Sequence, residues 1–241
     1  MLFRSCYGDD KMIFDKRIIK AIFLTRPNRF EAYVYMDGQE ILVHVPNTGR
    51  CSEILIPTVQ VLLREENNPR RKTKYDLIAA YKNGKLINID SQIPNKVVYE
   101  ALNKGKIEYF KKYNKIEKEK TFGNSRFDFK LSNFENQECY LEVKGVTLEH
   151  DEVTSFPDAP TERGKKHLME LVEVKKSGRE AGILFLIQMQ DVRYFTPYDE
   201  MDEEFGQALR YAQREGVCVS AYNCNVGESF IELDREIQIK L

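Results

Sequence analysis

The chain of 241 residues lacks several features that would assign a protein to a familiar class. It has no tryptophan and only three histidines. Its five cysteines, at positions 6, 51, 139, 218 and 224, include no C-x-x-C pair. An odd number without paired spacing does not fit a disulfide framework or a structural zinc site. These absences predict a reduced, cytoplasmic protein.

Long apolar runs and an excess of one charge are also missing. No stretch approaches the roughly 20 apolar residues that cross a bilayer, and the first residues lack the apolar core of a signal peptide. We therefore expect no membrane segment. Charged residues make up 31% of the chain, with a formal net charge of −1. Only local clusters can therefore argue for a polyanion partner.

Two patterns divide the chain into two domains. Residues 18–90 contain short runs of β-branched and aromatic residues, with Asp37-Gly38 and Asn83-Gly84 as hairpin turns. This pattern predicts a small β-barrel over residues 16–88. Residues 1–15 are predicted to be an N-terminal extension of little order, with Met12 as an alternative start.

Helical and strand-like segments alternate from residue 89 to residue 241. A helical pattern of apolar residues ends at Gly105, and Thr161 is a candidate N-cap of a second helix. The run "AGILFLIQM" is typical of a strand that is buried on both faces. The second domain is therefore predicted to be a mixed sheet flanked by helices.

Asp128, Glu142 and Lys144 stand out within two predicted strands. A hairpin between "RFDFKL" and "CYLEVKGV" would place these side chains together, with Phe127 and Phe129 facing the opposite layer. Clustered carboxylates suit a hard cation such as Mg²⁺ or Mn²⁺. A neighbouring lysine can orient a bound water for phosphodiester hydrolysis. The bland alternative is a solvated strand face with ion pairs between strands.

Several ordered blocks of the sequence carry a family resemblance. They are "HVPNTGR", "RRKTKYD", "SQIPN", "RFDF", "LEVKGVTL" and "FPDAPTERGKKHL". With these blocks the chain resembles the sugar fermentation stimulation protein A (SfsA) family. The resemblance implies an N-terminal OB-like barrel and a C-terminal domain of the PD-(D/E)xK nuclease type. It also implies DNA binding without strong sequence preference and a link to the regulation of sugar (maltose) use.

The resemblance also suggests roles for individual residues. Asp128, Glu142 and Lys144 match the acidic-acidic-lysine core, and Glu100 matches an acid on the preceding helix. We expect Asp128, Glu142 and the backbone carbonyl of Val143 to hold Mg²⁺ or Mn²⁺. The alternative for Glu100 is a solvated helix residue.

Basic residues in three segments are candidate DNA contacts, because phosphates are neutralised by lysine and arginine. The alternatives are a solvated basic loop and, for His167, a packed histidine. The candidates are Arg50, then Arg70, Arg71, Lys72 and Lys74 with Tyr75 beside them, and Arg163, Lys166 and His167.

Three functions remain open from the sequence. The first is a DNA-binding protein with a metal-dependent nuclease site. The second is a non-catalytic DNA-binding regulator that keeps the nuclease fold. The third is a nuclease that acts on RNA or branched DNA. The sequence leaves open whether the site is active, whether single or double strands bind, and whether the protein dimerises.

Overall fold

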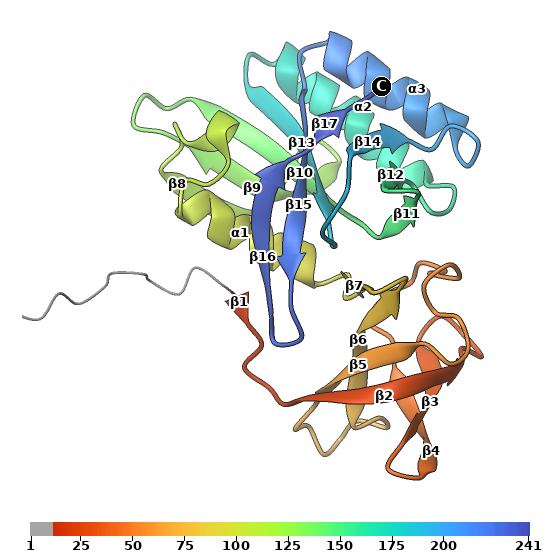
Figure 1. Cartoon of the computed structure of the whole chain (residues 1–241). Coiled ribbons are helices and arrows are strands. Elements are labelled where there is room, and N and C mark those ends of the chain that lie inside the picture. Colours follow the sequence, from red (N-terminus) through yellow and green to blue (C-terminus); the bar gives the residue numbers. More distant parts are fainter. Residues whose placement is uncertain (1–11) are drawn as a thin grey trace, which may run out of the picture.

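The computed structural model describes residues 12–241. Most of the predicted N-terminal extension, residues 1–11, lies outside the described residues. The described chain begins with β1 (Met12–Ile13), which pairs antiparallel with β16 (Phe230–Glu236) of the second domain. Figure 1 shows the barrel below the larger C-terminal domain, with α1 (Ile93–Asn103) on the side of that domain that faces the barrel.

The first domain is a closed barrel, as predicted, and the ring has five strands. Strand β4 pairs with β6 through His44 and Asp76, and this contact closes the order β4-β3-β2-β5-β6. Asp37-Gly38 and Asn83-Gly84 all have positive φ, and each pair joins two antiparallel strands. Both hairpin predictions are therefore confirmed. The strands are β2 (Ile18–Thr25), β3 (Glu31–Met36), β4 (Gln39–His44), β5 (Gln60–Glu65) and β6 (Tyr75–Lys82), and β7 (Lys85–Asn88) extends the sheet beyond the ring.

The second domain is built on a mixed seven-stranded sheet with the order β1-β16-β15-β13-β10-β9-β8. Strands β10, β13 and β15 run parallel, and the outer strands pair antiparallel. The strands are β8 (Lys115–Phe122), β9 (Ser125–Ser132), β10 (Glu138–Val146), β13 (Glu180–Ile187) and β15 (Cys218–Val226). A smaller sheet contains β11 (Leu148–His150), β12 (Val153–Phe156), β14 (Tyr194–Pro197) and β17 (Gln238–Ile239), and one turn of 3₁₀ helix covers Glu108–Phe110.

Helices cover both faces of the large sheet, because β13 is apolar on both sides. Ile183 and Phe185 pack in one cluster with α2 (Glu162–Lys176) and α3 (Glu203–Arg214). Leu184 and Leu186 pack in a second cluster with α1. The prediction of a doubly covered strand is thus confirmed, and a strand of this kind requires layers on both faces.

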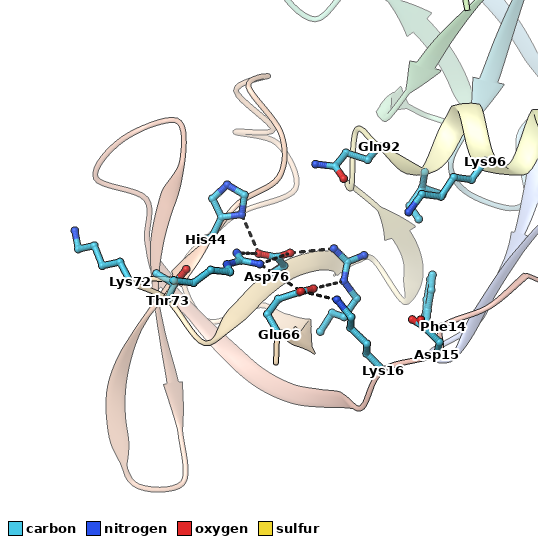
Figure 2. A pocket seen from close by; sticks show the side chains of 13 residues that line it. Phe14, Asp15, Lys16, His44, Glu66, Lys72, Thr73, Asp76, Gln92 and Lys96 are labelled. Atoms are coloured by element: carbon cyan, nitrogen blue, oxygen red, sulfur yellow. Dashed lines mark hydrogen bonds and ion pairs between the residues drawn. The ribbon is translucent and has the colours of Figure 1, made fainter. Parts of the chain in front are cut away.

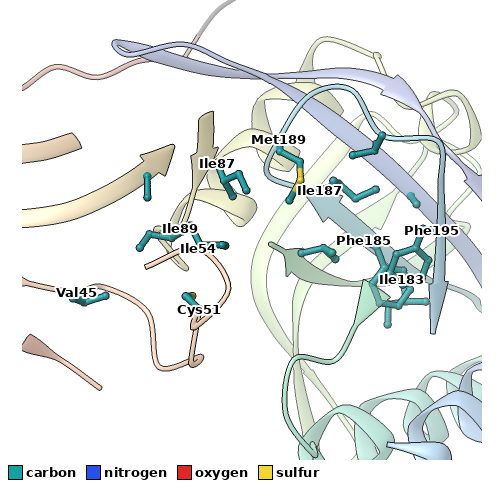
Figure 3. Close-up of a cluster of buried hydrophobic side chains, with 14 of the residues drawn as sticks. Val45, Cys51, Ile54, Ile87, Ile89, Ile183, Phe185, Ile187, Met189 and Phe195 are labelled. Carbon is teal, nitrogen blue, oxygen red and sulfur yellow. The ribbon is translucent and has the colours of Figure 1, made fainter. Parts of the chain in front are cut away.

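The two domains share one apolar cluster at their junction. Figure 3 shows Val45, Cys51 and Ile89 of the barrel side with Ile187 and Met189 of the other domain, and all five belong to one continuous core. Burial of shared apolar surface stabilises the two domains against one another.

Hydrogen bonds fix the relative position of the domains within this junction. The buried Gln188 amide donates to the Asn88 side-chain oxygen at 2.9 Å and to the Asp90 carbonyl at 3.2 Å. At the tip of the β15–β16 hairpin, Glu228 pairs with Lys20 at 2.6 Å. In the part of the chain that the structure describes, no helix has the length and apolar character needed to cross a membrane.

Candidate metal centre and nucleic-acid interface

The predicted hairpin exists and carries the acidic residues. Strands β9 and β10 pair antiparallel, and their ladder ends at Leu141 opposite Phe129. Beyond that pair, the Asp128 carboxylate accepts a hydrogen bond from the Val143 amide at 2.8 Å. The side chain thus satisfies a backbone donor of β10. This bond draws the Asp128 carboxylate to the segment that contains Glu142.

The two phenylalanines beside Asp128 do not share a layer, contrary to the sequence-based expectation. Phe129 stacks on Tyr99 of α1, with ring centroids 6.2 Å apart. Phe127 instead contacts Tyr140 and His167 on the α2 side, at 5.9 Å in each case. Strict alternation along a strand would place both rings on one face. The change of face coincides with the end of the regular ladder with β10 at Phe129.

Glu142 is the most enclosed acid of the hairpin, with 4% of its surface exposed. Its Oε1 atom accepts from Lys144 Nζ at 2.6 Å and lies 2.5 Å from His167 Nδ1. Its Oε2 atom is buried and has no hydrogen-bond partner. A buried carboxylate oxygen without a donor is costly, because it has lost water and gained nothing in exchange.

The two carboxyl groups differ in electrostatic environment. Burial raises the pKa of Asp128, and the negative charge of Glu142 raises it further, against the opposing effect of the Val143 amide. Burial also raises the pKa of Glu142, but the hydrogen bond from His167 and the charge of Lys144 outweigh it and lower the pKa overall. Glu142 is therefore held ionised, whereas ionisation of Asp128 is disfavoured until a positive charge joins the pair.

Helix α1 reaches the site through Asn95, which the sequence reasoning missed. Its Nδ2 atom donates to Asp128 Oδ1 at 2.6 Å. Glu100, the predicted acid of this helix, lies elsewhere. It is 3.9 Å from Lys104 and borders the same small hollow as Glu232 of β16. Asn95 and Tyr99 are four residues apart and share the face toward β9, and Glu100 is turned away by its helical position. We do not include Glu100 in the site.

The donor set fits a hard divalent cation. Asp128 and Glu142 supply two carboxylates, and the orphan Oε2 atom of Glu142 is an acceptor that lacks a donor. Mg²⁺ commonly binds one or two carboxylates and retains several waters. Among residues 12–241, no group of three or more His, Cys, Asp and Glu side chains converges as a ready-made metal cage. The fit is thus to an ion that keeps much of its water shell.

The predicted basic loop of the barrel is largely neutralised by the protein itself. Arg71 pairs with Asp76 and with Glu66, in a network that Arg64 completes through Glu66, Asp76 and Asp90. Lys72 and Lys74 pair with Glu31 and Glu65, at 2.7 and 2.8 Å. Tyr75 is only 8% exposed, so its ring is not available for stacking on a base. Arg70 is exposed.

This network lines a cleft of about 800 Å³ between the barrel and the start of α1. Figure 2 shows Gln92, just before that helix, and Lys96 within it on one side of the cleft, and Asp76 and Glu66 on the other. No hydrogen bond or ion pair of the exposed Lys96 side chain is found among the described residues. Lys96 follows Asn95 in the chain, so the cleft and the acidic site meet at the first turn of α1.

The remaining basic candidates lie in two places. Thr161 caps α2, and its side chain accepts from the Gly164 amide at 3.0 Å, as predicted. Near the start of α2, Arg163 and Lys166 are exposed, whereas His167 is 4% exposed and bonded to Glu142. His167 is therefore not free to contact a phosphate. Arg50 is exposed, in the barrel loop next to Gly49, whose position abuts Asp158 before α2.

Comparison with known proteins places this geometry in a family. A family model described as the sugar fermentation stimulation protein RE domain matches residues 92–230, and one described as the SfsA N-terminal OB domain matches residues 24–89. Sugar fermentation stimulation protein homologs of Clostridium kluyveri and Clostridium tetani are 69% and 64% identical over 230 residues, which are 95% of this chain and 100% of each relative. The chain belongs to the sugar fermentation stimulation protein family.

A solved structure from the SfsA family has the same fold. The Pyrococcus furiosus SfsA superimposes with a TM-score of 0.87 at 26% sequence identity, over 95% of this chain and 98% of that chain. That protein was solved in complex with Ca²⁺. The OB-like barrel and the helix-flanked mixed sheet expected from the resemblance are thus the fold of this SfsA family member.

Proposed function

We propose that this SfsA family member is a nuclease that requires a divalent ion and acts on DNA with little sequence preference. The observation that carries the proposal is the Glu142 carboxylate. One of its oxygens has two donors, and the other is buried without a partner beside a second carboxylate of raised pKa. The Ca²⁺ complex of the P. furiosus relative supports a divalent ion in the family. Mg²⁺ or Mn²⁺ is the proposed cofactor.

Asp128, Glu142 and the Val143 carbonyl would hold the ion. A divalent ion in such a site supplies Lewis acidity toward a phosphodiester and lowers the pKa of bound water. The protein contributes the alignment. Asn95 and the Val143 amide fix the Asp128 carboxylate, and Lys144 presents an ammonium group that can donate to water or to a phosphate oxygen.

The proposed DNA contacts are exposed basic side chains of both domains. They are Arg163 and Lys166 at the start of α2, Arg50 and Arg70 of the barrel, and Lys96 at the mouth of the cleft. Contacts of this kind bind the phosphate backbone and do not read sequence. We withdraw Arg71 and Tyr75 from the proposed surface because both are engaged within the protein.

Incubation with labelled single-stranded, duplex and branched DNA tests the proposal. Mg²⁺, Mn²⁺ or EDTA is added, and the Asp128→Ala variant is assayed in parallel. We expect a product that requires the ion and is lost in the variant while DNA binding persists. Cleavage by Asp128→Ala at the wild-type rate would refute the assignment of the metal site.

A non-catalytic DNA-binding regulator, connected with sugar use, is the second candidate. The observation that favours it is that, within residues 12–241, only two carboxylates meet at the site, since Glu100 lies toward β16. This candidate predicts salt-sensitive DNA binding without product on every substrate, with or without a divalent ion.

A further inference from the structure

The histidine of α2 makes a contact that neither phosphate binding nor simple packing explains. His167 Nδ1 lies 2.5 Å from Glu142 Oε1, and both side chains are almost fully buried. On its other side, Arg163 Nε donates toward His167 Nε2 at 3.5 Å. An ionised carboxylate only accepts, so the close contact with Glu142 assigns the proton of a neutral ring to Nδ1, and the contact of Nε2 with Arg163 agrees with this tautomer. The ring therefore donates to the Glu142 carboxylate.

We propose that His167 is a positioning residue that assigns the two oxygens of Glu142 to different tasks. Its hydrogen bond holds Oε1 toward α2, which leaves the buried Oε2 as the oxygen for a cation. The inference rests on the proposed function of the site as a divalent-ion centre. Groups that orient a ligand side chain in this way typically change metal affinity about 10–100-fold when they are removed.

The arrangement has a consequence for Lys144, which donates to the same Oε1 atom. If Lys144 alone held the carboxylate, its ammonium group could not turn to a substrate without releasing Glu142. With His167 in place, Glu142 keeps a donor while Lys144 moves. His167 thus holds the Glu142 carboxylate, so that Lys144 can turn to the substrate.

Two substitutions separate this role from packing, because His167 both donates to Glu142 and contacts the Phe127 ring at 5.9 Å. His167→Asn places an amide nitrogen where Nδ1 stands, so it keeps the donor and loses the ring. His167→Phe keeps a ring and loses the donor. Retained far-UV circular dichroism establishes that each variant folds.

The measurements are the melting temperature in EDTA and the affinity for Ca²⁺ and Mn²⁺ by titration calorimetry without DNA. We expect His167→Phe to bind both ions about 10–100-fold more weakly than the wild type. We expect His167→Asn to bind near the wild-type affinity although it melts at a lower temperature. Ion affinity would then follow the hydrogen-bond donor that His167→Asn keeps, and the melting temperature would follow the ring that His167→Phe keeps. A purely structural role would not separate the two measurements.

Two results would overturn the inference, and they differ in whether the proposed metal site is also wrong. If the wild type binds ions and His167→Phe binds them equally well, the positioning role is wrong and the proposed metal site stands. If the wild-type protein binds neither Ca²⁺ nor Mn²⁺, the positioning role and the proposed nuclease site fall together.

Discussion

Asp128→Asn should stabilise the protein in the absence of divalent ions. The raised pKa of Asp128 means that folding favours its protonated form. Its stabilising contribution is therefore present at low pH and is lost as the pH rises through the pKa of the folded state, so at neutral pH the ionised group opposes folding. An asparagine removes the charge. It can still accept from the Val143 amide, while the Asn95 amide turns to present its oxygen to the new NH₂ group.

The size of the effect can be bounded. Single favourable substitutions commonly add about 0.5–2 kcal/mol. For a chain of this size 1 kcal/mol corresponds to about 2–4 °C in melting temperature, so we expect Asp128→Asn to melt about 1–8 °C higher in EDTA. Free ion at 100 times its Kd should stabilise the wild type by about 2.7 kcal/mol, or about 5–10 °C, and should leave the variant unchanged.

Thermal unfolding in EDTA, Mg²⁺, Mn²⁺ and Ca²⁺ at pH 7.5, followed by circular dichroism, is the assay. Asp199→Asn is the matched control, because Asp199 forms an exposed ion pair with Arg210 of α3, 2.5 Å apart, away from the site. The control should keep the full ion-induced shift. The reasoning would be refuted by an Asp128→Asn protein that melts below the wild type in EDTA, or that ions stabilise as much as they stabilise the control. Either result would show that Asp128 and Glu142 are not a repelling carboxylate pair that binds an ion.

Two further predictions concern protons and DNA. The pKa of Glu142 is lowered and that of Asp128 is raised, so below the Asp128 pKa the binding of an ion should release one proton, from Asp128. In that range the log affinity for Mn²⁺, measured by calorimetry at a series of pH values, should rise with pH with a slope of one. A slope of two would contradict this prediction. Lys96→Gln should lower the slope of log affinity for single-stranded DNA against log salt concentration by about 0.7, which is about fivefold in affinity at 0.1 M salt. Fluorescence anisotropy measures the affinity, and Lys176→Gln at the end of α2 is the matched control. Equal slopes for Lys96→Gln and the wild type would show that DNA does not contact the cleft at Lys96.

Most of the fold could be predicted because its determinants are local. The Asp-Gly and Asn-Gly turns specify hairpins through positive φ, and the run around Phe185 specifies a strand that is covered on both faces. The Thr161 cap is equally local. The hairpin that joins Asp128 to Glu142 followed from two short strands and the spacing between them. In each case the information lies within a few residues of the element.

The chemistry of the site depended on contacts between distant segments, and there the sequence was less informative. The family resemblance suggested Glu100 as the acid of this helix, but the rotation of α1 brings Asn95 to Asp128 instead. The basic residues at the start of α2 left His167 either as a phosphate contact or as a packed histidine, and the structure pairs it with Glu142, 25 residues away. No local pattern distinguishes an outward-facing histidine from one that donates to a buried carboxylate.

The barrel contributes to the site through the helix that connects the domains. Arg64 of β5 donates to Asp90 at 2.8 Å, and the other oxygen of Asp90 accepts from the Gln92 amide at 2.9 Å, directly before α1. That helix in turn presents Asn95 to Asp128. The basic side chains of the barrel therefore have two different roles. Arg64 fixes the helix that orients the candidate metal ligand, and the cations outside its network are the candidates for the proposed DNA contacts.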